Sequence, residues 1–191
     1  QRMVRRCGAQ PGGGIPYQVD KMVNFYAKYI PNPFITIYYE AVGGGSVSPS
    51  TDQFMAYTEG PAGSTGTTPL GYEFKGWFNN DMGLGTPIST NLKFTPSKPA
   101  GGWTDGMTFY AVWEGNSDAL TYDANKGTGE MSASTGNVGS EVAVKENQFT
   151  RQGYYFAGWN TKADGTGTTY MPGENYTLTA GDVFCLQYGR K

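Results

Sequence analysis

Carboxylates and aromatic rings are the side chains through which this sequence could do chemistry, because it contains no histidine. The absence of histidine excludes the usual Ser-His-Asp and Cys-His catalytic arrangements and most zinc sites. Carboxylates alone could still act as a general acid and a general base. However, Glu40 and Asp123 occupy equivalent positions in two copies of an internal repeat, which favours a structural role for both. We therefore expect no enzyme activity, no catalytic residue and no cofactor.

Two short loops carry the alternating oxygen donors that calcium sites use. The first is residues 123–127, Asp-Ala-Asn-Lys-Gly, and the second is residues 160–165, Asn-Thr-Lys-Ala-Asp-Gly. The segment equivalent to the first loop, residues 40–43, lacks the second donor, which favours a plain turn. The Asp-Gly pair in the second loop is typical of a tight hairpin. We expect no metal at either loop.

Tryptophans are the residues best suited to contact a partner, because an exposed indole can stack on a sugar ring. Trp77 and Trp159 stand at the same place in two copies of the repeat, which favours packing in a core or between modules. Trp103 has no counterpart and is the better candidate for a partner contact. Buried rings at these positions would favour a structural role, whereas exposed rings beside a groove would favour sugar binding.

Composition indicates small β-rich domains. Glycine (29 residues) and aromatic residues (15%) are both abundant, which is typical of short strands joined by tight turns. The net charge of −2 gives no electrostatic basis for binding nucleic acid. No run of about 18 apolar residues is present, so we expect no membrane span in this sequence. Cys7 and Cys185 stand near opposite ends, and we expect no disulfide between them.

A repeat of 82 to 84 residues organises the chain. Residues 71–77, GYEFKGW, recur as residues 153–159, GYYFAGW, at a separation of 153 − 71 = 82. Three matches at nearly one period predict tandem modules of similar fold. The other two are Tyr39-Glu40-Ala41 with Tyr122-Asp123-Ala124, at 122 − 39 = 83, and residues 25–29 with residues 109–113, at 109 − 25 = 84.

Each repeat unit is expected to consist mainly of strands. Residues 35–40 have the β-branched and aromatic composition of a strand. Residues 72–77 alternate with period two, which places Tyr72 and Phe74 on the face opposite Trp77. Residues 108–113 are apolar on both faces, so this strand should be central or covered. Gly43–Gly45 is typical of a hairpin turn, and no capped helix follows that would make it a phosphate-binding loop.

The residues between these strands give weaker signals. Residues 52–58 and 141–147 fit either a single helical turn or another strand. Residues 61–68 and 161–169 are rich in glycine, threonine and serine and are expected to be loops. Residues 78–107 contain few apolar anchors and are expected to be an inserted loop.

The repeat divides the chain into three parts. Residues 1–34 are the C-terminal remnant of one unit, residues 35–117 are a complete unit with an inserted loop, and residues 118–191 are a unit with a damaged last strand. Residues 31–33 and 114–117 are expected to be short linkers, the first stiffened by proline and the second left freer by glycine.

Both ends of the chain depart from the repeat. Residues 184–188 read FCLQY where residues 109–113 read FYAVW, and a shifted reading frame can encode a closer match. We hypothesise that residues 1–11 and the last strand are frameshifted or are sequencing artefacts. Cys7, Cys185 and the arginines would then carry no function; the arginines are Arg2, Arg5 and Arg6.

The order of these motifs resembles the Listeria–Bacteroides repeat, also called the internalin B-repeat. The resemblance covers nearly the whole chain, and its motifs mark the repeat without indicating a ligand. It implies a β-grasp-like fold, in which a small mixed sheet packs over a short helix or an irregular crossover, and it implies a bacterial surface protein. The residues that carry it are Tyr39, Gly71, Tyr72, Phe74, Gly76, Trp77, Phe109, Ala111, Trp113, Tyr122, Gly153, Tyr154, Phe156, Gly158 and Trp159.

The sequence therefore favours a non-catalytic segment of a Gram-positive cell-surface protein, outside the cell and joined to the cell wall. It would act as a stalk or spacer and as part of an adhesin, with the export signal and the anchor outside this sequence. The alternative is a carbohydrate- or glycoprotein-binding module that uses exposed aromatic rings. The expected partners are neighbouring repeats and a host glycoprotein or glycan, bound weakly and through several copies at once.

Overall fold

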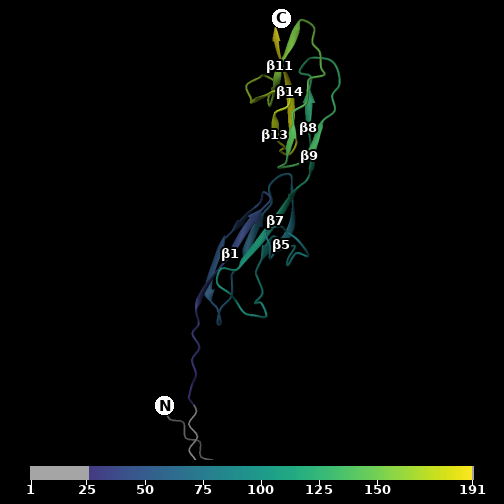
Figure 1. Ribbon diagram of the computed structural model, residues 1–191. Helices are drawn as coiled ribbons and strands as arrows, with labels where there is room; N and C mark the ends of the chain where they lie inside the picture. The colour runs from purple at the N-terminus through teal and green to yellow at the C-terminus, as the bar shows by residue number, and fades with distance from the viewer. Residues whose placement is uncertain (1–25, 191) are drawn as a thin grey trace, which may run out of the picture. The chain divides into compact units, whose positions relative to one another are not determined.

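The computed structural model describes residues 26–190 (Figure 1). Residues 32–190 form one compact unit. This unit contains two modules, the first built on β1 to β7 and the second on β8 to β14. The expected remnant of an earlier repeat, including its Phe25, Cys7 and the arginine cluster, lies mainly outside the described residues.

Every regular element within residues 26–190 is a strand, which confirms the β-rich class. The strands of the first module are β1 (Phe34–Val42), β2 (Ser46–Ser48), β3 (Thr51–Met55), β4 (Ser64–Thr67), β5 (Tyr72–Phe78), β6 (Lys93–Phe94) and β7 (Thr108–Gly115). Those of the second module are β8 (Ser117–Asp123), β9 (Ser134–Asn137), β10 (Glu141–Ala143), β11 (Tyr154–Asn160), β12 (Thr169–Tyr170), β13 (Asn175–Thr177) and β14 (Val183–Arg190).

Each module is built on a mixed sheet. In the first module the order is β3-β1-β7-β5, where β1 and β7 are parallel and the other pairs are antiparallel. In the second module the order is β12-β11-β14-β8-β9, where β8 and β14 are parallel. Smaller sheets, β2-β4-β6 and β10-β13, complete the two modules. β7 lies between β1 and β5, which confirms the central alternative; one of its faces is buried and the other is partly buried.

The two mixed sheets share one register. Tyr39 pairs with Phe109 across β1 and β7, and Tyr122 pairs with Phe184 across β8 and β14. Across the antiparallel pairs, Phe74 lies opposite Trp113 and Phe156 lies opposite Tyr188. The last strand of the second module, whose residues depart from the repeat, therefore forms and pairs as β7 does. Tyr188 takes the position that Trp113 has in the first module.

A β-bulge corrects the predicted alternation in β5. The register shifts between Phe74 and Gly76, so Lys75 is the extra residue on this strand. Trp77 consequently returns to the face of Phe74, and their ring centroids lie 6.4 Å apart in the core. The prediction of opposite faces was wrong because a bulge resets the period of two. Gly76, at a φ of +133°, accommodates the bulge beneath Pro87, whose Cβ would lie 2.6 Å from an added Cβ.

The second module repeats this bulge. The register of β11 shifts between Phe156 and Gly158, and Gly158 has a φ of +144°. Trp159 again returns to the core, where its ring centroid lies 5.5 Å from that of Phe156. The Gly-Trp pair of the repeated motif is thus the second half of a bulge.

Each module has its own aromatic core. In the first, Trp77 and Trp113 pack with Tyr39, Phe94 and Phe109. In the second, Trp159 and Phe184 are the largest fully buried rings, and the apolar side chains around them are Leu120, Val142, Val144, Phe149 and Leu178. At roughly 25 cal/mol per Å² of buried apolar area, rings of this size dominate the stability of modules this small.

Several weak signals resolve as strands. Residues 52–58 and 141–147 contain β3 and β10, so the strand alternative was correct. Residues 61–68 were expected to be a loop but contain β4, which pairs with both β2 and β6. Tertiary pairing overrides the weak strand propensity of a Ser-Thr-Gly-Thr segment, and Gly66 lies against the Trp113 ring. The Gly43–Gly45 turn is present, but it does not close a hairpin, because β2 pairs with β4.

A single residue, Asn116, joins the two modules. Its backbone N–H donates to the carbonyl of Gly71 in the first module at 2.8 Å. Its carbonyl accepts the N–H of Val138 in the second module at 2.9 Å. The preceding Gly115 has no room for a side chain, because an added Cβ would collide with the Val138 carbonyl. Backbone hydrogen bonds therefore hold the junction on both sides.

Candidate functional site

The tryptophans of the repeated motif are buried. Trp77 and Trp159 are both 0% exposed, so neither can stack on a sugar. Their indole N–H groups donate to backbone carbonyls, as buried indoles usually do. Trp77 donates to Asn91 at 3.1 Å and to Leu92 at 3.3 Å, and Trp159 donates to Lys145 at 2.9 Å.

The other motif residues surround these indoles. Phe109, Ala111 and Trp113 are buried in the first module. The partly buried rings of Tyr72 and Phe74 pack against this core. Tyr122 and Phe156 do the same in the second module, and Tyr154 contacts Tyr188 edge-to-face at 5.8 Å. The motif glycines occupy turns and bulges at positive φ; they are Gly71, Gly76, Gly153 and Gly158.

A buried tyrosine in the first core donates a hydrogen bond to a carboxylate. Tyr39 is 1% exposed, and its hydroxyl donates to Asp52 Oδ2 at 2.8 Å. The same oxygen accepts the backbone N–H of Gly63 at 2.8 Å. Burial raises the pKa of Tyr39 well above its usual range, and the hydrogen bond and charge of Asp52 raise it further. The phenol therefore stays neutral and acts as a structural donor.

The second module has the equivalent tyrosine on a different partner. The Tyr122 hydroxyl lies 2.8 Å from Ser134 Oγ and accepts the backbone N–H of Lys145 at 3.0 Å. A separate pair, Tyr176 and Asp182, is 2.9 Å apart. Burial first, then the hydrogen bond to Asp182, raises the pKa of Tyr176 to about 12. Tyr176 is therefore not poised for acid–base chemistry near neutral pH.

The loops with alternating oxygen donors form turns. Asp123 Oδ1 accepts the backbone N–H of Asn125 at 2.6 Å, and Asn125 has a positive φ of 43°. Asp164 Oδ1 accepts both the N–H and the hydroxyl of Thr166, at 3.0 and 2.7 Å. Asn160 is fully buried, and its side chain bonds to backbone groups of the 161–168 loop. Within residues 26–190 no group of three or more Cys, Asp or Glu could hold a metal ion.

Trp103 is half-buried. Its ring packs edge-to-face on Phe54, with the centroids 5.2 Å apart, and joins the margin of the first core. The ring is neither fully covered nor a free flat platform. Part of it remains available to solvent at the surface of the 78–107 insertion.

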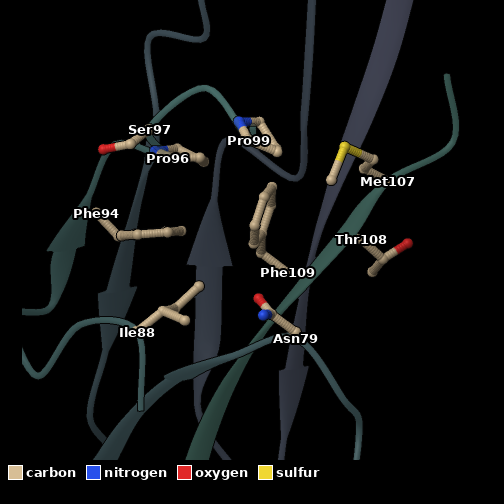
Figure 2. A pocket seen from close by; sticks show the side chains of 9 residues that line it. All are labelled: Asn79, Ile88, Phe94, Pro96, Ser97, Pro99, Met107, Thr108 and Phe109. Atoms are coloured by element: carbon tan, nitrogen blue, oxygen red, sulfur yellow. The ribbon is translucent and has the colours of Figure 1, made fainter. Parts of the chain in front are cut away.

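A pocket of about 480 Å³ lies beside this insertion. Figure 2 shows its walls, where the Phe94 and Phe109 rings lie next to each other with centroids 5.5 Å apart. These rings are only 8% and 7% exposed, so little of either face is open to a ligand. The lining has no charged residue: it consists of Asn79, Ile88, Phe94, Pro96, Ser97, Pro99, Met107, Thr108 and Phe109.

The sequence reasoning missed most of this pocket. The insertion was expected to hold few apolar anchors, yet Phe94 is buried and stacks on Trp77 at a centroid distance of 5.1 Å. Phe94 stands in a two-residue strand that carries no periodic pattern, so no local signal marks it as core. Its ring is the one large aromatic between Phe78 and Trp103, and that isolation is the only hint that the sequence offers.

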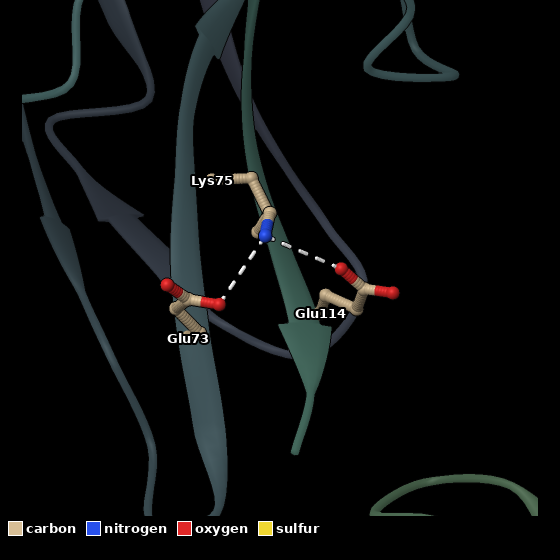
Figure 3. Close-up of polar contacts among 3 residues, drawn as sticks. All are labelled: Glu73, Lys75 and Glu114. Atoms are coloured by element: carbon tan, nitrogen blue, oxygen red, sulfur yellow. Dashed lines mark hydrogen bonds and ion pairs between the residues drawn. The ribbon is translucent and has the colours of Figure 1, made fainter. Parts of the chain in front are cut away.

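Three charged side chains form a small cluster at the sheet surface of the first module. Figure 3 shows Lys75 between Glu73 and Glu114, with N–O distances of 3.2 and 3.5 Å. The hydrogen bond to Glu73 first, and then its charge, raise the pKa of Lys75, and Glu114 adds to this rise. The cluster crosses β5 and β7 on the solvent side, where such pairs contribute little to stability.

The comparisons with known proteins agree with the repeat. The model of the Listeria-Bacteroides repeat domain matches residues 36–112 and 119–183. A protein of Evansella cellulosilytica named "Putative membrane protein" is 31% identical over 162 residues, which is 80% of this chain and 22% of that protein. A "Putative Gly-rich membrane protein" of the same organism is 31% identical over 111 residues, 56% of this chain and 13% of that protein. No solved structure matches.

The chain thus spans less than a quarter of the length of these relatives. Between residues 26 and 190, no helix has the length and apolar character needed to cross a membrane. The two matched segments coincide with the two modules and together cover most of the sequence. The chain belongs to the Listeria-Bacteroides repeat family and carries two copies of its domain.

Proposed function

We propose that this chain is a non-catalytic spacer segment of a cell-envelope protein, displayed outside the cell on a Gram-positive wall. One observation carries the proposal: both modules bury their equivalent motif rings in their own cores, with Trp77 and Trp159 fully covered. Residues that recur in each repeat are thereby used for folding, not for a ligand. The names of the relatives, which describe membrane proteins, support an envelope location.

We also propose that each module is β-grasp-like. The supporting feature is the mixed sheet in which the first and last long strands, β1 with β7 and β8 with β14, run parallel and side by side. The family fold allows a short helix or an irregular crossover beneath the sheet, and the described residues contain an irregular crossover with short strands.

A spacer needs a fixed geometry between neighbouring modules, and the hydrogen bonds at the junction support such a geometry. Asn116 bonds to Gly71 and Val138 on its two sides, and Gly181 N–H donates to Asp118 Oδ2 at 2.9 Å just beyond. The two bonds of Asn116 use backbone groups that a flexible linker would leave in solvent. We therefore expect neighbouring repeats of one chain to be the main partners of each module.

Backbone ¹⁵N relaxation of the 191-residue chain tests this proposal. We expect amides of β1 to β7 and of β8 to β14 to share one rotational correlation time. A matched variant with Gly-Ser-Gly-Ser inserted after Asn116 should separate the two values while each module stays folded. Two different correlation times in the unmodified chain would contradict a spacer role, because the modules would then be freely jointed.

A weak adhesive role is the second candidate. It is favoured by the 480 Å³ pocket and the half-buried Trp103, both of which belong to the first module's insertion. The partner would be a host glycoprotein or glycan, held through many copies of the repeat. A glycan array probed with the multimerised chain should then show binding that Trp103→Ala removes, and a blank array would contradict it.

A further inference from the structure

The side chain of Arg151 in the second module packs on two aromatic rings. Its guanidinium lies over the Tyr154 ring at 4.2 Å and over the Tyr188 ring at 5.0 Å. Stacking of this kind fixes the plane of the guanidinium and leaves its N–H edges free. Within residues 26–190, no ion pair or side-chain hydrogen bond engages it.

The free N–H groups of the Arg151 guanidinium are exposed to solvent and are not buried without a partner. Among the described residues, no buried side-chain nitrogen or oxygen lacks a partner, so the Arg151 nitrogens reach solvent. They do so in a pocket of about 540 Å³, a size that suits a small ligand. Its polar lining includes Thr128, Thr150 and Gln152, and its apolar wall includes Phe149 and Phe156.

The first module has different residues at the equivalent position. At the separation of 82 residues, Arg151 corresponds to Pro69, and Tyr188 corresponds to Trp113 by strand register. The Trp113 indole N–H donates to Thr68 Oγ1 at 2.8 Å. The donor there is internally satisfied and no cation is present at the corresponding position, so the feature is specific to the second module.

From this arrangement we propose that the Arg151 pocket binds the carboxylate of an acidic sugar unit, such as a uronic acid. A planar guanidinium held by two rings matches a carboxylate in a bidentate pair. Hydroxyl and amide groups around it, from Thr128, Thr150 and Gln152, suit the hydroxyls of a sugar ring. This goes beyond the spacer role, because it assigns a ligand class to one module alone.

The charges around the pocket favour one carboxylate over a polyanion. Among the side chains that the structure describes, Arg151 is the only charged one in the lining. Burial raises the pKa of Tyr188; Arg151 opposes this rise and Asp123 adds to it, so the carboxylate of Asp123 acts on the same region. A second negative charge on the ligand would meet Asp123 and a chain of net charge −2. An acidic peptide or a phosphate dianion is therefore a poorer match than a monoacidic sugar.

Titration of the labelled 191-residue chain with glucuronic acid, observed by NMR, tests the proposal. We expect shifts of the Arg151 side-chain N–H and of the Tyr154 and Tyr188 ring signals, and none at Tyr72 or Trp113. Glucose, which lacks the carboxylate, should produce no such shifts. Arg151→Gln should weaken glucuronate binding by about tenfold or more, since it removes a charge-assisted pair.

A second pair of variants covers the case in which Arg151→Gln unfolds the module. Gln152 is exposed at the pocket and packs in no core, so Gln152→Glu should weaken binding by repulsion and Gln152→Lys should strengthen it. Equal shifts with glucose, equal binding of sulfate, or tighter binding of an oligoglutamate peptide would overturn the proposal. So would the absence of any shift with glucuronate in the folded chain.

Discussion

The two modules share their strand pairings and differ in how they satisfy the groups around them. In the first, Tyr39 donates to the carboxylate of Asp52, and in the second, Tyr122 meets the neutral hydroxyl of Ser134. Asp52 and Ser134 stand 134 − 52 = 82 residues apart, so they are equivalent positions. Both modules thus place a tyrosine hydroxyl at the same position, but its hydrogen-bond partner is a carboxylate in one and a hydroxyl in the other.

The solvent side of the sheets shows the same freedom. Lys75 with Glu73 and Glu114 covers β5 and β7 in the first module. In the second, the equivalent of Glu114 is Gly189, and the ring of Tyr155 lies directly over it. An aromatic ring across from a strand glycine replaces the packing that the glycine lacks. Both modules have the bulge and the buried rings, whereas the exposed residues at the perimeter of the sheets differ between them.

The largest expected effect is the loss of either buried indole. Trp77→Ala and Trp159→Ala should each cost about 3–5 kcal/mol, because a fully buried tryptophan leaves a large cavity. Such a loss is comparable to the whole stability of a small domain. Denaturant titration followed by amide signals of each module should show unfolding of the mutated module at much lower denaturant. Equal loss in both modules from one substitution would show that the two cores are coupled.

The main strands of each module could be predicted from the sequence because their buried aromatic residues recur in both repeats. The strands at residues 35–40 and 108–113 were predicted from their composition, and the structure extends them to Phe34–Val42 and Thr108–Gly115. The face of Trp77 was not predictable from alternation, since a bulge is decided by cross-strand register. Phe94 and the Arg151 stack were missed for a related reason: each depends on a ring that is distant in sequence.

The next effect sharpens the comparison of tyrosine partners. Asp52→Ala removes a charged acceptor from Tyr39 and Gly63 and should cost about 1.5–3 kcal/mol. Ser134→Ala removes neutral bonds to Tyr122 and to the Ala143 carbonyl and should cost about 0.5–1.5 kcal/mol. Chemical denaturation resolved by module measures both. Equal losses would mean that the charge of Asp52 contributes nothing to the first core.

Alkaline pH should act on the second module through Tyr176. Its pKa rises from 10.0 to about 12 on folding, so the folded state favours the neutral phenol. The stabilisation is fully present below pH 10 and is lost as the pH rises through about 12. Stability measured across this range should fall, and Tyr176→Phe should flatten the part of the decline assigned to the second module. An unchanged slope in that variant would place the titrating group elsewhere.

The smallest effect belongs to the surface cluster of the first module. Lys75→Gln breaks both ion pairs, yet all three side chains are largely exposed, and solvent and salt already screen their attraction. We expect no resolvable change in the denaturation midpoint, at low or high salt. The matched change in the second module, Tyr155→Ala, uncovers the Gly189 backbone and should lower its stability measurably, because a ring that excludes water from a strand cannot be replaced by solvent. If Lys75→Gln lowered stability more than Tyr155→Ala, the ion pairs of the first module would be shown to stabilise the fold, contrary to our view that the exposed perimeter can vary.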